Sequence, residues 1–197
     1  MLEDKEIEII KKNIKRFLNE KSIIKEKEGK FIDFFVNNSN NSLDSAKLLF
    51  EISTKKELQK LTGFPDFNGF LWIINAGYYS MFSMARALLE KEGIKIKPES
   101  FSVHLITFNA LVYYFYLTGK IQKSFIEEFR EAGEESFEAL GKEKAKSLME
   151  DYYYEKDKRG RFTYEMWEIA MQNKAETSLN RAKRFNEETR KILELKK

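Results

Sequence analysis

The stretch FLWIINAGYYSMFSMARALL, residues 70–89, decides the fold. Apolar or aromatic side chains occur on nearly every side of a helix built from it, and the main polar interruptions are Asn75, Ser80, Ser83 and Arg86. A helix that is apolar all round is surrounded by other helices, so this stretch predicts the centre of a helical core. Its length would also suit a membrane span, but a lipid-facing segment would not readily carry Arg86 and Asn75.

Composition favours one all-α domain with an extension. The chain has 197 residues, with only two prolines and nine glycines, and long stretches show helical spacing. We expect an up-and-down bundle of four to five helices over residues 43–197, preceded by a helical extension over residues 1–42. Without cysteine and with a single His, disulfides, thiol nucleophiles and multi-His metal sites within one chain are excluded, and no cofactor is expected.

The net charge of the chain and the composition of its first residues indicate which partners and which cellular location to expect. The formal net charge is +3, so any binding of nucleic acid must be local. The beginning, MLEDKEIEIIKK, carries acidic residues and no apolar core of a secretory signal. We therefore expect a cytoplasmic protein without a membrane partner.

The first 42 residues read as a helix followed by a linker. Residues 3–20 carry an apolar stripe at intervals of three and four, formed by Ile7, Ile10, Ile14 and Phe17. NNSNNS at 37–42 has the composition of a loop, and we place the domain boundary there. Ser42 or Asp44 is expected to cap the next helix.

The rest of the chain predicts further helices. The expected ranges are 43–61, 70 to about 92 with an end at Gly93, a third helix that is capped by Ser100 or Ser102 and runs to about 117, 124–154 with a break at Gly133 or Gly141, and 162–195.

Two motifs carry a family resemblance. Residues 77–94, GYYSMFSMARALLEKEGI, and residues 104–121, HLITFNALVYYFYLTGKI, occur in that order. Together they resemble HEPN helical domains, specifically the small prokaryotic subgroup found beside minimal nucleotidyltransferases. The resemblance implies a helical bundle, a homodimer, a nucleotidyltransferase partner, and a role with RNA or nucleotide, including toxin-type ribonuclease activity.

Residues 152–165, YYYEKDKRGRFTYE, are the densest candidate site. The segment interleaves aromatic rings, such as Tyr154, with the cations of Lys156, Lys158 and Arg161. Cations suit RNA phosphates and rings suit unpaired bases, so these residues are candidates for RNA or nucleotide binding. The alternative is a solvated basic hinge between two helices.

The resemblance assigns catalytic roles at the entrance to the last helix. HEPN proteins carry an Arg there, followed after four to six residues by a His; the Arg holds phosphate and the His serves as acid or base without a metal. Here Arg159 matches the Arg and Tyr164 occupies the His position. Because the pKa of Tyr is ordinarily near 10, Tyr164 is a poor base at neutral pH.

His104 is the remaining candidate for RNA or nucleotide binding. The alternative is that His104 is a packed or capping residue.

Arg86 needs a carboxylate or a backbone carbonyl as partner on its apolar helix, and pairing within the fold is the favoured role. Asn75, Tyr79 and Ser83 lie on one side of that helix and form either a hydrogen-bond seam or part of a pocket.

Two functions compete. The first is an RNA- or nucleotide-binding HEPN-like protein, as a dimer that brings both Arg159 segments to a shared cleft, with ribonuclease activity left open. The second is a non-catalytic module for dimerisation and protein interaction. A neighbouring gene for a minimal nucleotidyltransferase, or an RNA-cleavage assay, distinguishes them.

Overall fold

The computed structural model describes residues 3–26, 29–100, 102–153 and 160–194, with the backbone alone between 142 and 168. In chain order, its elements are α1 (Asp4–Asn19), β1 (Ile23–Lys25), α2 (Ile32–Thr54), α3 (Lys56–Thr62), α4 (Phe70–Lys91), β2 (Ile94–Ile96), α5 (Val103–Leu111), the π-helical segment η1 (Val112–Tyr116), α6 (Lys123–Tyr153) and α7 (Gly160–Glu194). The fold is an all-α bundle, as the sequence predicts.

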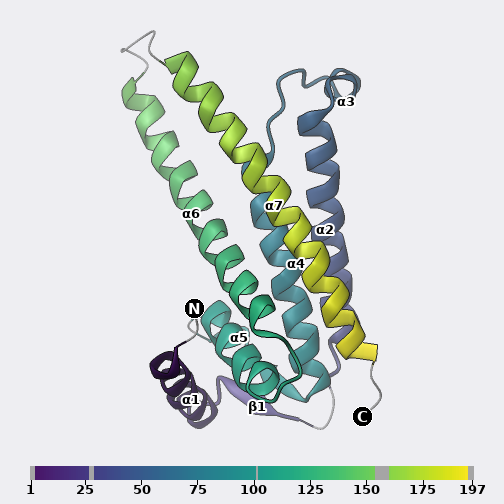
Figure 1. Cartoon of the computed structure of the whole chain (residues 1–197), viewed down its shortest axis with the longest axis vertical. Helices are drawn as coiled ribbons and strands as arrows, with labels where there is room; N and C mark the ends of the chain where they lie inside the picture. Colours follow the sequence, from purple (N-terminus) through teal and green to yellow (C-terminus); the bar gives the residue numbers. More distant parts are fainter. Residues whose placement is uncertain (1–2, 27–28, 101, 154–159, 195–197) are drawn as a thin grey trace.

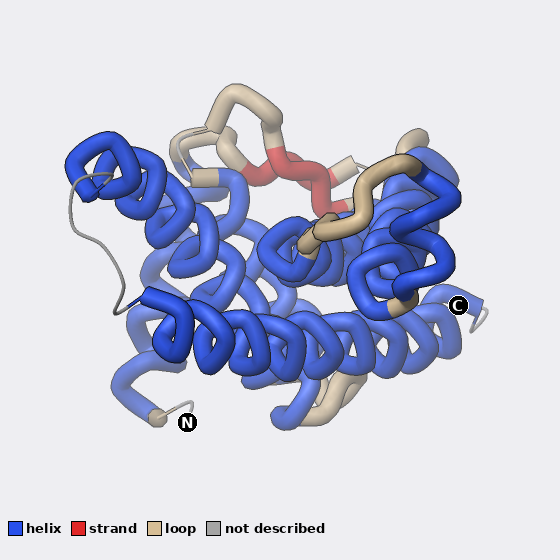
Figure 2. Tube along the Cα trace, turned by 90° about the horizontal axis from the view of Figure 1, so that it is seen from above, coloured by secondary structure: helices blue, strands red, loops and turns tan. Residues whose placement is uncertain are grey.

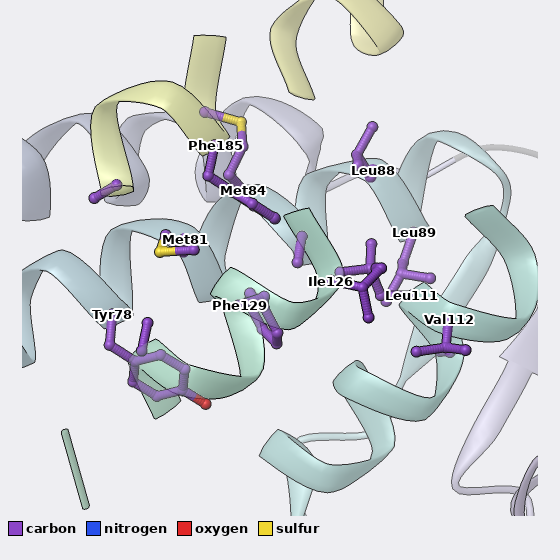
Figure 3. Packing of buried hydrophobic residues seen from close by; sticks show 14 of the residues in the cluster. Tyr78, Met81, Met84, Leu88, Leu89, Leu111, Val112, Ile126, Phe129 and Phe185 are labelled. Atoms are coloured by element: carbon purple, nitrogen blue, oxygen red, sulfur yellow. The ribbon is translucent and has the colours of Figure 1, made fainter. Parts of the chain in front are cut away.

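The helix α4 is the centre of this bundle. In Figure 1, α2, α4, α6 and α7 run along the long axis, while α1 and α5 lie together at one end. Five large side chains of α4 have no exposed surface: Ile73, Met81, Met84, Leu88 and Leu89. Figure 3 shows Met81 and Met84 towards Phe185 of α7, and Phe129 of α6 packed nearby. The prediction of a central helix over residues 70–89 is confirmed.

Close packing around α4 depends on small residues. A Cβ at Gly77 would lie 2.6 Å from Oγ of Ser178, so a larger residue would push α7 away. A Cβ at Gly133 would lie 3.2 Å from the Tyr78 ring, and α6 continues through this glycine and through Gly141. The predicted break at Gly133 or Gly141 is therefore wrong, because Gly133 serves contact with α4.

The predicted loop at residues 37–42 is also wrong. The helix α2 is continuous from Ile32 to Thr54, through the expected boundary at residue 42. Ser42 and Asp44 accordingly lie inside this helix and cap nothing. Ser39 is fully buried and hydrogen-bonded to Ser80, so bonds between helices outweigh the low helix propensity of this stretch.

The N-terminal helix α1 packs on the main bundle through the predicted stripe. Ile10, Ile14 and Phe17 are buried, and α1 contacts α5 and η1. A two-stranded antiparallel sheet, absent from the sequence prediction, holds the extension in place: β1 pairs with β2, with Ile24 opposite Lys95. Figure 2 shows these strands at the edge of the bundle.

Residues with positive φ lie just after the end of α4 and just before the beginning of α5. Gly93 has φ +71° and follows α4, as predicted; a Cβ there would lie 2.0 Å from the carbonyl oxygen of Glu26, next to β1. Ser102 occupies the position before α5 with φ +73°, but its side chain makes no capping hydrogen bond. The expected cap by Ser102 is thus wrong in its chemistry, although the helix begins there.

Residues 70–89, whose length would suit a membrane span, belong to the buried helix α4. Among the helices of the described ranges, none combines the length and the apolar character that crossing a bilayer requires.

Candidate functional site

His104 and Tyr78 form a hydrogen-bonded pair between α5 and α4. The Tyr78 hydroxyl oxygen lies 2.8 Å from Nδ1 of His104, and the two rings stack with centroids 5.6 Å apart. Burial raises the pKa of Tyr78 far above its ordinary value, so the phenol keeps its proton at neutral pH. The pair is satisfied when the phenol donates to Nδ1, which leaves the imidazole proton on Nε2.

His104 is uncharged at neutral pH. Burial lowers its pKa below the ordinary value of 6.5, and the positive charge of Arg86 lowers it further. The neutral ring lies among aromatic rings, with centroid distances of 4.4 Å to Phe82, 5.8 Å to Tyr79 and 5.6 Å to Phe137. The predicted alternative of a packed His fits this environment.

The rings around His104 leave an uncharged surface, which we call the aromatic face and define by Tyr79, Phe82, His104 and Phe137. Tyr79 is 45% exposed and Phe137 is 57% exposed. Trp72, two turns before Tyr79 on α4, is also exposed and extends the same side of that helix. Large exposed apolar side chains that gather in one place typically mark a contact surface.

The predicted catalytic and RNA-binding segment lies at the junction of α6 and α7. The helix α6 ends at Tyr153 and α7 begins at Gly160. Tyr154, Lys156, Lys158 and Arg159 are outside the described residues. Arg161 and Tyr164 belong to the first turns of α7, where the backbone alone is described.

His104 lies far along the bundle from Tyr153, the end of α6, and from Gly160, the beginning of α7. Phe137, which contacts His104, is followed by α-helix as far as Tyr153, about 24 Å at a rise of about 1.5 Å per residue. On the other helix, Ser178 lies beside Ile74, and Gly160 is about 27 Å earlier along α7. Both paths separate His104 from the described start of α7.

Arg86 has the structural role favoured by the sequence. Its guanidinium donates to the carbonyl oxygen of Ile96 at 3.0 Å and lies 4.7 Å from the centre of the Phe35 ring. Burial lowers the pKa of Arg86, while the charge of Glu90 opposes that shift. The predicted backbone-carbonyl partner is confirmed, and the bond joins α4 to β2.

The seam proposed along α4 divides into two parts. Asn75 accepts a hydrogen bond from Ser136 of α6 and donates to the carbonyl of Leu71. Tyr79 instead belongs to the exposed aromatic face. The predicted hydrogen-bond seam therefore includes Asn75 but not Tyr79.

Tyr78 is the site residue that sequence reasoning missed. It lies 26 positions from His104, so spacing gave no sign of their contact, although the two residues belong to the two motifs that resemble HEPN domains.

Metal chemistry has no candidate in the parts of the chain described. There, no group of three or more His, Cys, Asp or Glu side chains lies close enough to hold a metal ion. The aromatic face consequently offers rings and one neutral imidazole.

Comparison with known proteins gives no family assignment. The chain matches no protein-family model, no curated protein and no solved structure. Its relation to HEPN domains rests on the two sequence motifs and is a proposal.

Proposed function

We propose that the protein is a HEPN-like RNA-binding protein whose RNA-binding segment is residues 152–165. One observation supports this assignment above others: α6 ends at Tyr153 and α7 begins at Gly160. The segment therefore spans the entrance to the last long helix, which is where the family resemblance predicts the functional Arg.

Each residue type in the segment has a role in this proposal. Arg159 grips a phosphate with two parallel hydrogen bonds, and Lys156, Lys158 and Arg161 add charge. The ring of Tyr154 stacks on an unpaired base. Binding rather than cleavage is the activity that we propose, because Tyr164 stands where the family's motif has its acid or base.

Fluorescence anisotropy with labelled single-stranded and duplex RNA tests the proposal. We expect the single strand to bind more tightly, with an affinity that decreases as salt increases. A gel run on the same mixtures detects cleavage, and Tyr164→Phe separates the roles of its hydroxyl. Loss of cleavage with intact binding would assign the hydroxyl a chemical role, whereas no RNA binding by the parent protein would refute the proposal.

The resemblance also predicts a minimal nucleotidyltransferase as partner. Its gene is expected beside the gene for this chain, and co-purification of the two products is the direct measurement.

A second function, a non-catalytic homodimerisation module, is favoured by the aromatic face. Its residues carry no charge at neutral pH, so a second copy can approach the same surface without like-charge repulsion. A two-fold axis through the face would place the exposed Phe137 and Tyr79 rings of one copy against those of the other.

Light scattering at tens of micromolar distinguishes this second function. We expect the parent to be a dimer and Phe137→Glu to be a monomer, because the new carboxylate would be buried against its own copy. Leu48→Glu is the matched control, since Leu48 is 60% exposed on α2, outside the aromatic face. A monomeric parent, or dissociation by both variants alike, would contradict an interface on this face.

A further inference from the structure

Two rings of the aromatic face stand nearly perpendicular to the imidazole of His104. Tyr79 on α4 and Phe137 on α6 are each inclined by 82° to that ring, with centroids 5.8 Å and 5.6 Å from it. Both side chains are exposed, and within the described part of the chain no ring contact joins Tyr79 to Phe137 directly. Each of the two rings therefore keeps surface that a group from another molecule can contact.

Glu134 places a carboxylate beside this surface. It is exposed and precedes Phe137 by three positions on α6, and side chains with this spacing lie on the same side of a helix. The preceding residue, Gly133, is close to the aromatic cluster, since a Cβ there would lie 3.2 Å from the Tyr78 ring. This turn of α6 thus borders the aromatic face and carries a negative charge.

Glu134 differs from the other carboxylates of its helix. No Lys or Arg nitrogen of the described residues pairs with it, and Arg130 of α6 is already bound to Glu6 at 2.7 Å. The other glutamates of α6 up to residue 141 each lie within 4.0 Å of a cation: Glu127, Glu128, Glu131, Glu135 and Glu138. The charge of Glu134 therefore remains available to a cation from another molecule.

The side chains that form the aromatic face carry no positive charge that would repel such a cation. Residues 70–85 of α4 and the whole of α5 contain no Lys or Arg. His104 is neutral at pH 7, because burial lowers its pKa. The nearby Arg86 is buried, and its guanidinium donates to the carbonyl of Ile96. The faces of Tyr and Phe rings attract cations, so the surface suits a positively charged group.

We propose that the aromatic face is the docking site for an arginine side chain of a partner protein. The guanidinium packs against the exposed rings of Tyr79 and Phe137 and donates to the carboxylate of Glu134. Arginine fits better than lysine, because a planar guanidinium can stack on a ring while it donates two parallel hydrogen bonds. A two-fold axis through the face would instead bring a second Glu134 to this surface. The inference does not rest on RNA binding at residues 152–165.

The openness of the surface favours a protein over a small molecule as the source of the cation. Small-molecule sites are concave and bury most of their ligand, whereas Tyr79 and Phe137 are 45% and 57% exposed. Exposed apolar side chains continue along both helices, with Trp72 two turns before Tyr79 and Leu140 one turn after Phe137. Apolar neighbours of the partner's arginine can contact these side chains, and arginine and aromatic residues are enriched at protein interfaces.

An NMR titration of the full chain, followed through the aromatic signals of Tyr79, His104 and Phe137, tests the proposal. The probes are N-acetylarginine methylamide, its uncharged citrulline counterpart, and the peptide acetyl-Leu-Arg-Leu-amide. We expect the arginine derivative to bind saturably and the citrulline derivative about fivefold more weakly or worse, because it lacks the charge. The peptide should bind more tightly than the arginine derivative, since its leucines add apolar contacts.

Three variants separate the contributions of the carboxylate and the ring. Glu134→Gln should weaken binding of the peptide about twofold to fivefold. Phe137→Leu, which keeps an apolar side chain but removes the ring, should weaken it about twofold or more. Glu187→Gln is the matched control, since Glu187 is an exposed glutamate on α7, outside the aromatic face, and this variant should bind the peptide like the parent.

Several results would overturn the proposal. These are no saturable change in the three signals, equal binding of the arginine and citrulline derivatives, or equal losses in Glu134→Gln and Glu187→Gln. Tighter binding of choline than of the peptide would indicate a small quaternary ammonium ligand in place of a protein. A dimer that dissociates in Phe137→Glu but not in Leu48→Glu would show that a second copy covers the face. Absence of RNA binding leaves the proposal unaffected, so the two failures are distinguishable.

Discussion

The hydroxyl of Tyr78 and Nδ1 of His104 are 2.8 Å apart, and this bond joins the central helix α4 to the first turn of α5. The Tyr78 ring has α6 on another side, where a Cβ at Gly133 would come within 3.2 Å of it. One phenol therefore contacts α5 and α6 from α4, and the protonation of His104 bears on how these three helices pack.

Stability should depend on pH through His104. Its pKa is lowered in the folded protein by burial, whereas the unfolded chain titrates near 6.5. Below about pH 6.5 the unfolded chain binds more protons, so this group's contribution to the free energy of unfolding falls as pH falls and is complete above that pH. Urea unfolding at pH 7.5, 6.5 and 5.5 measures it.

The variant His104→Asn keeps an acceptor for Tyr78 and removes the titration. We expect the free energy of unfolding to fall less in the variant than in the parent between pH 7.5 and 5.5. Subtracting one pH dependence from the other removes the contribution of the carboxylates that both proteins share. An identical pH dependence in the two proteins would be contrary to this assignment.

Truncation of Met81 should be costly. Met81 has no exposed surface and lies among α4, α6 and α7. Met81→Ala is expected to lower the free energy of unfolding by about 2–5 kcal/mol, because buried apolar contacts are lost and the neighbouring side chains close the cavity only in part. Leu48→Ala, at a position 60% exposed, should cost less than about 0.5 kcal/mol. Similar costs at both positions would argue against the central place of α4.

A buried polar cluster joins α2, α4 and α7. Asn186 donates from Nδ2 to the hydroxyl oxygens of Ser80 at 2.7 Å and Ser39 at 3.0 Å. Asn186→Ala should cost about 1–3 kcal/mol, since both hydroxyls lose a donor away from water. In a double-mutant cycle with Ser80→Ala, the combined cost should be smaller than the sum of the single costs. Strict additivity would show that this bond contributes nothing.

RNA binding should depend on the guanidinium of Arg159. Arg159→Lys keeps the charge but loses the two-bond geometry, so anisotropy should report weaker binding. Arg161→Ala should lower affinity and reduce the salt slope by about 1, as expected for one phosphate contact. Arg16→Lys on α1, an exposed site far along the chain, is the control. RNA affinity unchanged in Arg159→Lys would remove Arg159 from the site.

Sequence patterns predicted the helices that carry apolar residues on all sides, such as α4, or along one side, such as α1. They failed where distant side chains decide the structure. The asparagine-rich stretch around Ser39 is helical because Ser80 and Asn186 bond to it from α4 and α7. The strands β1 and β2 have three residues each, too few for alternation to be visible, and their pairing crosses most of the N-terminal half.

The same limit applies to the candidate site, where residue chemistry predicted one contact and the fold alone decided another. For Arg86, chemistry alone required a partner and named a backbone carbonyl as one possibility, which is what Ile96 provides. For His104, chemistry could not select Tyr78 among many donors, since their meeting depends on how α5 crosses α4.

The pairing of β1 with β2 also sets the order of events on the ribosome. Glu26, next to β1, and Lys95, in β2, are 69 positions apart. At synthesis rates of about 5–20 residues per second, the first strand waits roughly 3–14 s for its partner. The helix α1 packs on α5 and η1, which follow β2 in the chain, so throughout that interval its apolar stripe lacks these native partners. The N-terminal extension is therefore made before the surfaces on which it packs, and it docks only after α4 and β2 have emerged.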